Sequence, residues 1–165
     1  MRICLIGACG HSKQAYKYLL TRSDVTFVGM AAEDAREGLA TSYSPDIPFY
    51  ADWRRMLDTT QSDLAIVSPI FGHTGQVILA CAERGIDVFA EKPVASSYEE
   101  LDAVEYAVQK SKIQFCAMHY LRYTPAFYHG AKLVKEPFVT NTGAYEGKEV
   151  VQVYVSAPEG KLDKP

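Results

Sequence analysis

Residues 2–20, RICLIGACGHSKQAYKYLL, set the pattern that predicts the fold. The apolar run at 2–6 is typical of a buried strand, and GACGHS at 7–12 contains the glycines of a tight turn. KQAYKYLL at 13–20 spaces its apolar residues like one face of a helix. The residues expected on that face are Ala15, Tyr18 and Leu19. The stretch therefore predicts a strand, a turn and a helix in direct succession.

The same alternation continues along the chain. Further apolar runs predict strands at 26–30, 64–68, 86–90 and 113–118. Helices are predicted at 53–58, at 76–84 and from Ser97 onward. Strands that are apolar along their whole length need helices on both faces of a parallel sheet. We therefore expect a doubly wound parallel α/β sheet of the Rossmann type over residues 1–136.

The last predicted helix has a clear start signal. Ser97 precedes Glu100 by three residues, which is the spacing of a capping box. The apolar residues expected to face the sheet from this helix are Leu101, Val104 and Val108.

Composition and charge exclude several classes of protein. Of the 165 residues, 48% are hydrophobic, which is enough for one substantial core. The 17 Lys and Arg residues against 20 Asp and Glu residues give a net charge of -3, and no basic run suggests nucleic-acid binding. Apolar stretches are no longer than strands and no secretion signal precedes the first one, so we expect a cytoplasmic protein without membrane contact.

The cysteines favour free thiols. The chain has four, and none of them forms a C-x-x-C pair. Their apolar surroundings argue for reduced, mostly buried side chains over disulfides or a zinc site. No metal site is therefore expected. The four residues are Cys4, Cys9, Cys81 and Cys116.

Ligands of doubly wound sheets bind beyond the carboxyl ends of the strands. The turn at 7–12 lies at that edge, where the free N–H groups of a helix start can hold a pyrophosphate. A full G-x-G-x-x-G motif would have glycine at the positions of Cys9 and Ser12, and Gly10 offers nearby relief for the backbone. Glu91, Lys92 and Pro93 leave the fourth predicted strand at the same edge.

Four motifs, IGACGH, SPIFGH at 68–73, VFAEKPVA at 88–95 and LRYTPAF at 121–127, occur in this order. Together they resemble the N-terminal domain of the glucose-fructose oxidoreductase and inositol dehydrogenase (Gfo/Idh/MocA) family. The resemblance covers about residues 1–136. It implies an NAD(P)-dependent oxidoreductase that acts on a sugar or polyol hydroxyl, with Lys92 as the catalytic residue that assists proton transfer.

The turn and the resemblance together assign a set of residues to the cofactor. These are Gly7, Cys9, Gly10, His11, Ser12, Glu33, Ser68, Pro69, His73, Glu91, Lys92 and Pro93. Arg122 and Tyr123 are candidates for contact with substrate or nicotinamide, with surface packing as the alternative. His119 and His129 are expected to be structural or to face solvent.

Ribose recognition departs from the family pattern. The resemblance implies an acidic residue at the end of the second strand, where this chain has Ala31 and Ala32. Glu33 follows and could replace it, which favours NAD, whereas Arg36 could meet a 2′-phosphate and favour NADP. The sequence slightly favours NAD.

Residues 137–165 have a different texture. Alternation at Val151, Val153 and Val155 predicts strand, in a β-rich tail that resembles a fragment of the fibronectin type III-like domain of family 3 glycoside hydrolases. The resemblance implies a substrate domain after the Rossmann domain, and residues 137–165 do not resemble one. A substrate surface would then come from a homo-oligomer or a partner chain. The alternative is a non-catalytic nucleotide-binding or interaction module whose tail pairs with a partner by edge addition.

Overall fold

The computed structural model describes residues 1–34, 38–119 and 124–125. Within it, Met1–His119 forms one compact unit. The predictions for Arg36, Arg122, Tyr123, His129 and the β-rich tail at 137–165 lie outside the described residues. The predicted domain boundary at residue 136 also lies there and stays a prediction.

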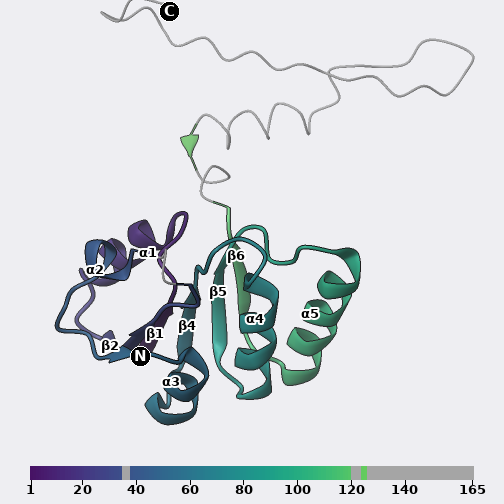
Figure 1. Ribbon diagram of the computed structural model, residues 1–165, viewed down its shortest axis with the longest axis horizontal. Helices are drawn as coiled ribbons and strands as arrows, with labels where there is room; N and C mark the ends of the chain where they lie inside the picture. Colours follow the sequence, from purple (N-terminus) through teal and green to yellow (C-terminus); the bar gives the residue numbers. More distant parts are fainter. Residues whose placement is uncertain (35–37, 120–123, 126–165) are drawn as a thin grey trace, which may run out of the picture. The chain divides into compact units, whose positions relative to one another are not determined.

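A six-stranded sheet forms the centre of the unit, and every neighbouring pair of its strands is parallel (Figure 1). Its order is β3-β2-β1-β4-β5-β6. The chain adds β2 and β3 on one side of β1 and then crosses over to add β4, β5 and β6 on the other side, so the strand order reverses between β1 and β4. This confirms the doubly wound fold and places the expected ligand crevice beside β1 and β4. The strands are β1 Arg2–Ile6, β2 Thr26–Ala31, β3 Phe49–Tyr50, β4 Leu64–Val67, β5 Asp87–Glu91 and β6 Phe115–Met118.

Helices cover both faces of the sheet. They are α1 Ser12–Leu19, α2 Leu39–Ser42, α3 Trp53–Thr60, α4 Thr74–Glu83 and α5 Tyr98–Ser111. Buried residues of α3, α4 and α5 share one core with one face of the sheet. Buried residues of α1 and α2 share the second core with the other face. This explains the apolar character of the strands, because every strand except the two-residue β3 contributes side chains to both cores.

Strand β1 shows the division most clearly. Cys4 and Ile6 lie in the first core. Ile3 and Leu5 lie in the second. All four side chains are fully buried, and burial of a large aliphatic side chain contributes about 1.5–3 kcal/mol. The strand that opens the sequence pattern is therefore central to the packing of both layers.

The buried face of α1 differs from the prediction. Tyr18 is largely exposed, and Tyr16 is buried in its place. The Tyr16 ring lies 4.9 Å from the ring of Phe27 and 5.1 Å from that of Tyr43, and its hydroxyl accepts a hydrogen bond from the Ser44 N–H. These aromatic partners favour Tyr16 as the inward residue.

The start of α5 was only partly predicted. The Ser97 side chain accepts a hydrogen bond from the Glu100 N–H at 3.1 Å, as a capping box requires. The Glu100 carboxylate instead accepts from the N–H and the hydroxyl of Ser96. Leu101 is 40% exposed, so the prediction that it faces the sheet was wrong, whereas Val104 is 3% exposed as expected.

All four cysteines are free thiols, but only two of them are buried, fewer than predicted. Cys4 and Cys81 are buried, Cys9 is half-buried and Cys116 is exposed. Within the described part of the chain, none of the helices has the length and apolar character needed to cross a membrane.

Candidate functional site

The turn after β1 is fixed by backbone hydrogen bonds. The Gly7 N–H donates to the Ala31 carbonyl at 2.8 Å, and the Gly7 carbonyl accepts from the Tyr43 hydroxyl at 2.8 Å. Gly7 has a φ of +76°, and a Cβ there would lie 2.5 Å from the Cα of Pro69. Glycine is needed at this position for both reasons.

The loop after β4 is tied to the same turn. The Cys9 N–H donates to the Ser68 carbonyl at 2.9 Å, and the Ser68 hydroxyl donates to the Cys9 carbonyl. The buried Ser12 hydroxyl also donates to the Cys9 carbonyl, at 3.2 Å. Two loops on either side of the reversal in strand order therefore form one structure at the carboxyl edge of the sheet.

Glu91, the last residue of β5, is the buried acid of this edge. Its side chain is 1% exposed, and its Oε2 accepts the His11 N–H at 2.6 Å. The His11 Nδ1 lies 3.1 Å from Oε1. A Cβ on Gly10, whose φ is +60°, would lie 2.5 Å from the Glu91 Cδ. Gly10 is therefore required by the carboxylate of Glu91, which reaches the turn from a strand far along the chain.

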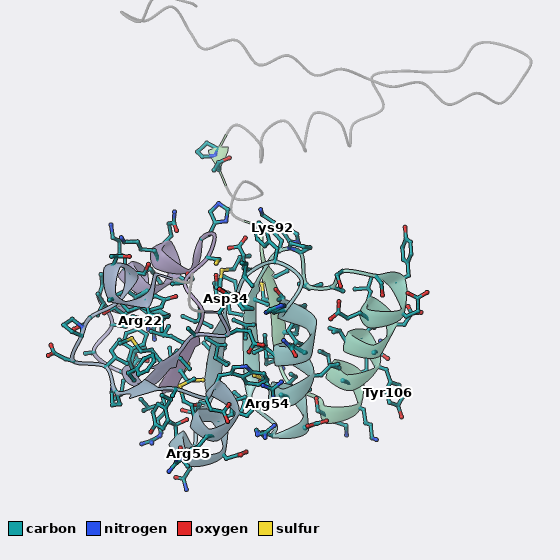
Figure 2. The ribbon with its side chains drawn as sticks, in the orientation of Figure 1. Arg22, Asp34, Arg54, Arg55, Lys92 and Tyr106 are labelled. Atoms are coloured by element: carbon teal, nitrogen blue, oxygen red, sulfur yellow. The ribbon has the colours of Figure 1, made fainter. Side chains whose placement is uncertain are left out.

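Lys92 follows Glu91 and points out of the sheet edge (Figure 2). Its Nζ lies 3.9 Å from the Glu91 Oε1 and 5.6 Å from the centroid of the Phe71 ring. Its side chain is about half exposed, and the Lys92–Pro93 peptide bond is cis. A buried carboxylate and an aromatic ring thus flank an accessible amine.

Glu33 lies in a second group of polar side chains, past the end of β2. Its carboxylate accepts hydrogen bonds from the Trp53 indole N–H and, at 2.8 Å, from the Gln76 amide. The His73 Nδ1 lies 3.8 Å from Glu33 Oε1 and is buried with no hydrogen-bond partner in the described part of the chain. The Arg54 guanidinium stacks 4.0 Å from the centre of the Trp53 ring. Glu33 is thereby held across the N-terminal turns of α3 and α4.

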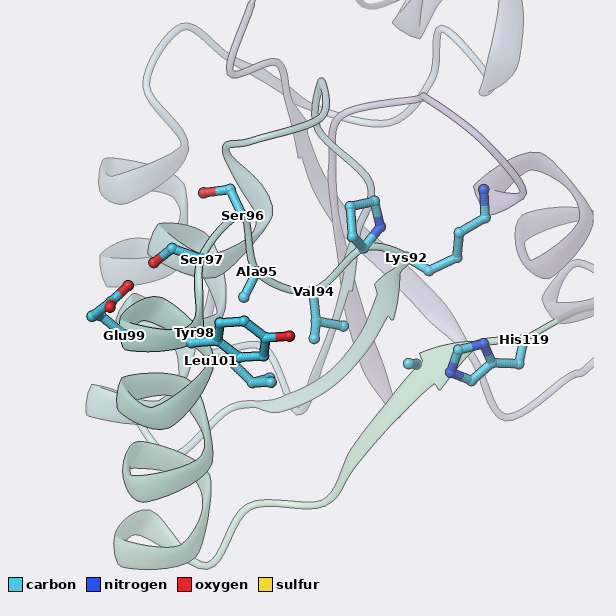
Figure 3. A pocket seen from close by; sticks show the side chains of 11 residues that line it. Lys92, Val94, Ala95, Ser96, Ser97, Tyr98, Glu99, Leu101 and His119 are labelled. Carbon is cyan, nitrogen blue, oxygen red and sulfur yellow. The ribbon is translucent and has the colours of Figure 1, made fainter. Parts of the chain in front are cut away.

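A hollow of about 680 Å³ begins at Lys92 and extends along the start of α5 (Figure 3). Its walls are mostly apolar, and its volume falls in the range of small-molecule sites. His119, which was expected to be structural or solvent-facing, is exposed and lines this hollow together with Lys92. The other lining residues are Pro93, Val94, Ala95, Ser96, Ser97, Tyr98, Glu99, Leu101 and Ala117.

The structure divides the residues assigned to the cofactor into two groups. Glu33 and His73 form a group at the starts of α3 and α4. The rest lie around the glycine turn and the end of β5: Gly7, Cys9, Gly10, His11, Ser12, Ser68, Pro69, Glu91, Lys92 and Pro93. Their roles toward a cofactor stay predictions.

Two residues of the site were not anticipated. Tyr43 holds the Gly7 carbonyl, and Phe71 lies beside Lys92. Phe71 stands within the SPIFGH motif, but no sequence pattern distinguishes it from a surface aromatic residue.

The family model described as "Oxidoreductase family, NAD-binding Rossmann fold" matches residues 1–119. The chain belongs to that family. This confirms the Gfo/Idh/MocA resemblance for the Rossmann domain, which is an NAD-binding oxidoreductase domain of the family.

Individual relatives match parts of the chain. A 2,7-anhydro-N-acetylneuraminate hydratase of Mediterraneibacter gnavus is 35% identical over 71 residues, which are 43% of this chain and 18% of the hydratase. Beta-glucosidase A of Butyrivibrio fibrisolvens is 61% identical over 33 residues, which are 20% of this chain and 4% of the glucosidase.

A solved structure shares the Gfo/Idh/MocA fold over more of the chain. The WlbA dehydrogenase of Chromobacterium violaceum, in complex with NADH and UDP-GlcNAcA, has a TM-score of 0.73 and 20% identity. The match covers 83% of this chain and 40% of that one. The chain thus spans less than half the length of these relatives.

Proposed function

We propose that the chain is the cofactor-binding part of an NAD-dependent dehydrogenase that oxidises a hydroxyl group of a sugar or polyol. The observation that carries this proposal is the contact between Glu91, the glycine turn and Lys92 at one edge of the sheet. The domain's family supports the cofactor. A carbohydrate substrate is supported by a relative that is a 2,7-anhydro-N-acetylneuraminate hydratase and by a dehydrogenase of similar fold that was solved with UDP-GlcNAcA.

The residues at the turn fit a dinucleotide. Gly7 and Gly10 both have a positive φ, a conformation that glycine adopts readily and that forms the tight turn between β1 and α1. Helix α1 begins directly after His11, and its first N–H groups favour an anion such as a pyrophosphate. We assign the pyrophosphate to this turn and the reactive end of the dinucleotide to the neighbourhood of Lys92.

Lys92 acts on the substrate hydroxyl. When its amine is neutral it takes up the hydroxyl proton, and as an ammonium it stabilises negative charge on that oxygen. Glu91 positions this amine, since its carboxylate is fixed by His11 and lies 3.9 Å from Nζ. When the dinucleotide is bound, its nicotinamide would supply the acceptor for the hydride.

Glu33 supports NAD over NADP. An acidic residue just past the end of β2 is suited to accept a hydrogen bond from a ribose hydroxyl. A 2′-phosphate at the same place would meet this negative charge. In thermal-shift titrations we expect NAD+ to stabilise the chain more than NADP+, and Glu33→Gln to narrow that difference. A larger shift with NADP+ would contradict the preference.

The dehydrogenase proposal is tested by Lys92→Ala. We expect the variant to lose dinucleotide reduction with a panel of sugars and polyols, while its affinity for the dinucleotide stays within about tenfold, or roughly 1.4 kcal/mol. Lys110→Ala is a matched control, because the Lys110 Nζ also lies 5.6 Å from an aromatic ring, that of Tyr106, but on α5. Equal activity of wild type and Lys92→Ala would refute the catalytic role of Lys92.

A further inference from the structure

Phe71 is an exposed aromatic residue at the ligand edge. Its side chain lies in the loop between β4 and α4 and is 59% exposed. Single exposed apolar side chains are common on protein surfaces, so it is the position of this ring beside Lys92, and not its exposure, that points to a ligand. Neither core includes Phe71, so packing within the described residues does not explain its position.

The loop holds the ring beside the reactive amine. Ser68, at the start of the loop, is bonded to the glycine turn through Cys9. Gly72, with a φ of +94° and no atom within 4 Å of a Cβ placed there, turns the chain directly after Phe71. The Phe71 ring centroid lies 5.6 Å from the Lys92 Nζ. The Phe71 ring therefore lies where the loop after β4 comes close to Lys92, at the end of β5.

The chemistry of the proposed reaction limits what can lie there. Lys92 must contact the oxygen of the substrate carbon that gives up a hydride, so the nicotinamide must lie close to the Lys92 amine. Phe71 already lies within that neighbourhood. The nicotinamide ring is planar and, when oxidised, positively charged, and the face of a phenyl ring attracts both planar rings and cations.

We propose that Phe71 stacks against the nicotinamide ring and so binds the reactive end of the dinucleotide. The inference rests on the proposed dehydrogenase function and assigns to that function a residue outside the glycine turn and the Glu91–Lys92 pair. Phe71 acts by binding and orienting the ring, and it takes no part in proton transfer.

The test compares ligands that contain or lack nicotinamide. Affinities for NAD+, NADH and ADP-ribose are measured by calorimetry for wild type and Phe71→Leu. We expect the variant to lose about three- to tenfold in affinity for NAD+ and NADH and to bind ADP-ribose as the wild type does. Phe71→Trp, which keeps an aromatic face, should restore the affinity for both nicotinamide ligands.

Phe49→Leu is the matched control, since Phe49 is 62% exposed in β3, the edge strand at the far end of the sheet order from β6. It should leave all three affinities unchanged. An equal loss for ADP-ribose in Phe71→Leu, or no loss for NAD+, would overturn the proposal while the dehydrogenase function stands. A wild-type chain that binds none of the three ligands would overturn both.

Discussion

The glycine turn and the hollow meet at Lys92 and are built in different ways. The turn is held by hydrogen bonds with four residues from other parts of the chain: Ala31, Tyr43, Ser68 and Glu91. The walls of the hollow are mostly apolar, and two of its lining residues, Tyr98 and Leu101, are exposed. The glycine turn is therefore held in place by hydrogen bonds within Met1–His119, whereas the hollow is shaped mostly by apolar walls.

The largest effect is expected from a substitution at Gly7, in the glycine turn. In Gly7→Ala the new Cβ would press on the Pro69 backbone, so the loop after β4 must move. We expect the free energy of unfolding to fall by about 3 kcal/mol and dinucleotide binding to weaken. Gly85→Ala is the control, because Gly85 also has a positive φ, +67°, but nothing lies within 4 Å of its Cβ position. The free energy of unfolding of Gly85→Ala should fall by about 1 kcal/mol. Equal losses in urea unfolding would show that the turn is no tighter than an open bend.

Glu91 provides the second test of the same contrast. Glu91→Ala removes the buried carboxylate that accepts the partly buried His11 N–H, and we expect about 2 kcal/mol of lost stability. Glu91→Gln keeps the shape and an acceptor oxygen, so it should lose less. The exposed Glu99, replaced by Ala, serves as the control in thermal unfolding. If Glu91→Ala melts with this control, the carboxylate does not hold the turn.

Helix α5 allows the hollow to be probed by itself. Val104→Ala removes buried methyl groups and should lose about 2 kcal/mol, whereas Leu101→Ala, three residues earlier and 40% exposed, should change stability by less than about 0.5 kcal/mol. Chemical denaturation measures both. A large loss for Leu101→Ala would mean that the hollow is covered in solution.

The thiols give the smallest effect. Burial raises the pKa of Cys4 to about 11 and also raises the pKa of Cys81. At pH 8 we therefore expect a thiol reagent to label Cys9 and Cys116 first, and the two core thiols only as the protein unfolds. Labelling of all four at one rate in the native protein would contradict the burial of the core.

The same burial predicts a pH dependence of stability. Cys4 titrates near 9 in the unfolded chain and near 11 in the folded one. The contribution of the Cys4 thiol to the stability of the fold is therefore complete below pH 9 and is lost as the pH rises from there toward 11. Unfolding midpoints between pH 8 and 11 should fall, and Cys4→Ala should flatten that fall.

Long apolar runs made the sheet predictable. Each strand from β1 to β6 except β3 was recognised, because runs in which apolar residues predominate, bounded by turn residues, favour a buried strand. Strand β3 has two residues, Phe49–Tyr50, and α2 has four, Leu39–Ser42, which is too short for any period to show. In α1 both Tyr16 and Tyr18 are available to the helix face, and only the contact with Phe27 and Tyr43 decides between them.

The site was predictable in its residues but not in its contacts. Gly7, Lys92 and the neighbouring motif residues could be identified, since the ends of parallel strands meet at one edge. The bond from His11 to Glu91 joins residues 80 positions apart, and no local pattern reports such a pair. Phe71 illustrates the same limit, because its place beside Lys92 depends on the path of the loop after β4.

The position of Glu91 has a consequence for how the two halves of the site influence one another. One carboxylate touches both the dinucleotide turn, through His11, and the amine of Lys92. Any ligand that shifts this carboxylate from one side changes its interaction with the other, and thermodynamic linkage makes that effect equal in both directions. Under the proposed function, we therefore expect occupancy of the turn and engagement of a hydroxyl at Lys92 to be coupled through the single buried side chain of Glu91.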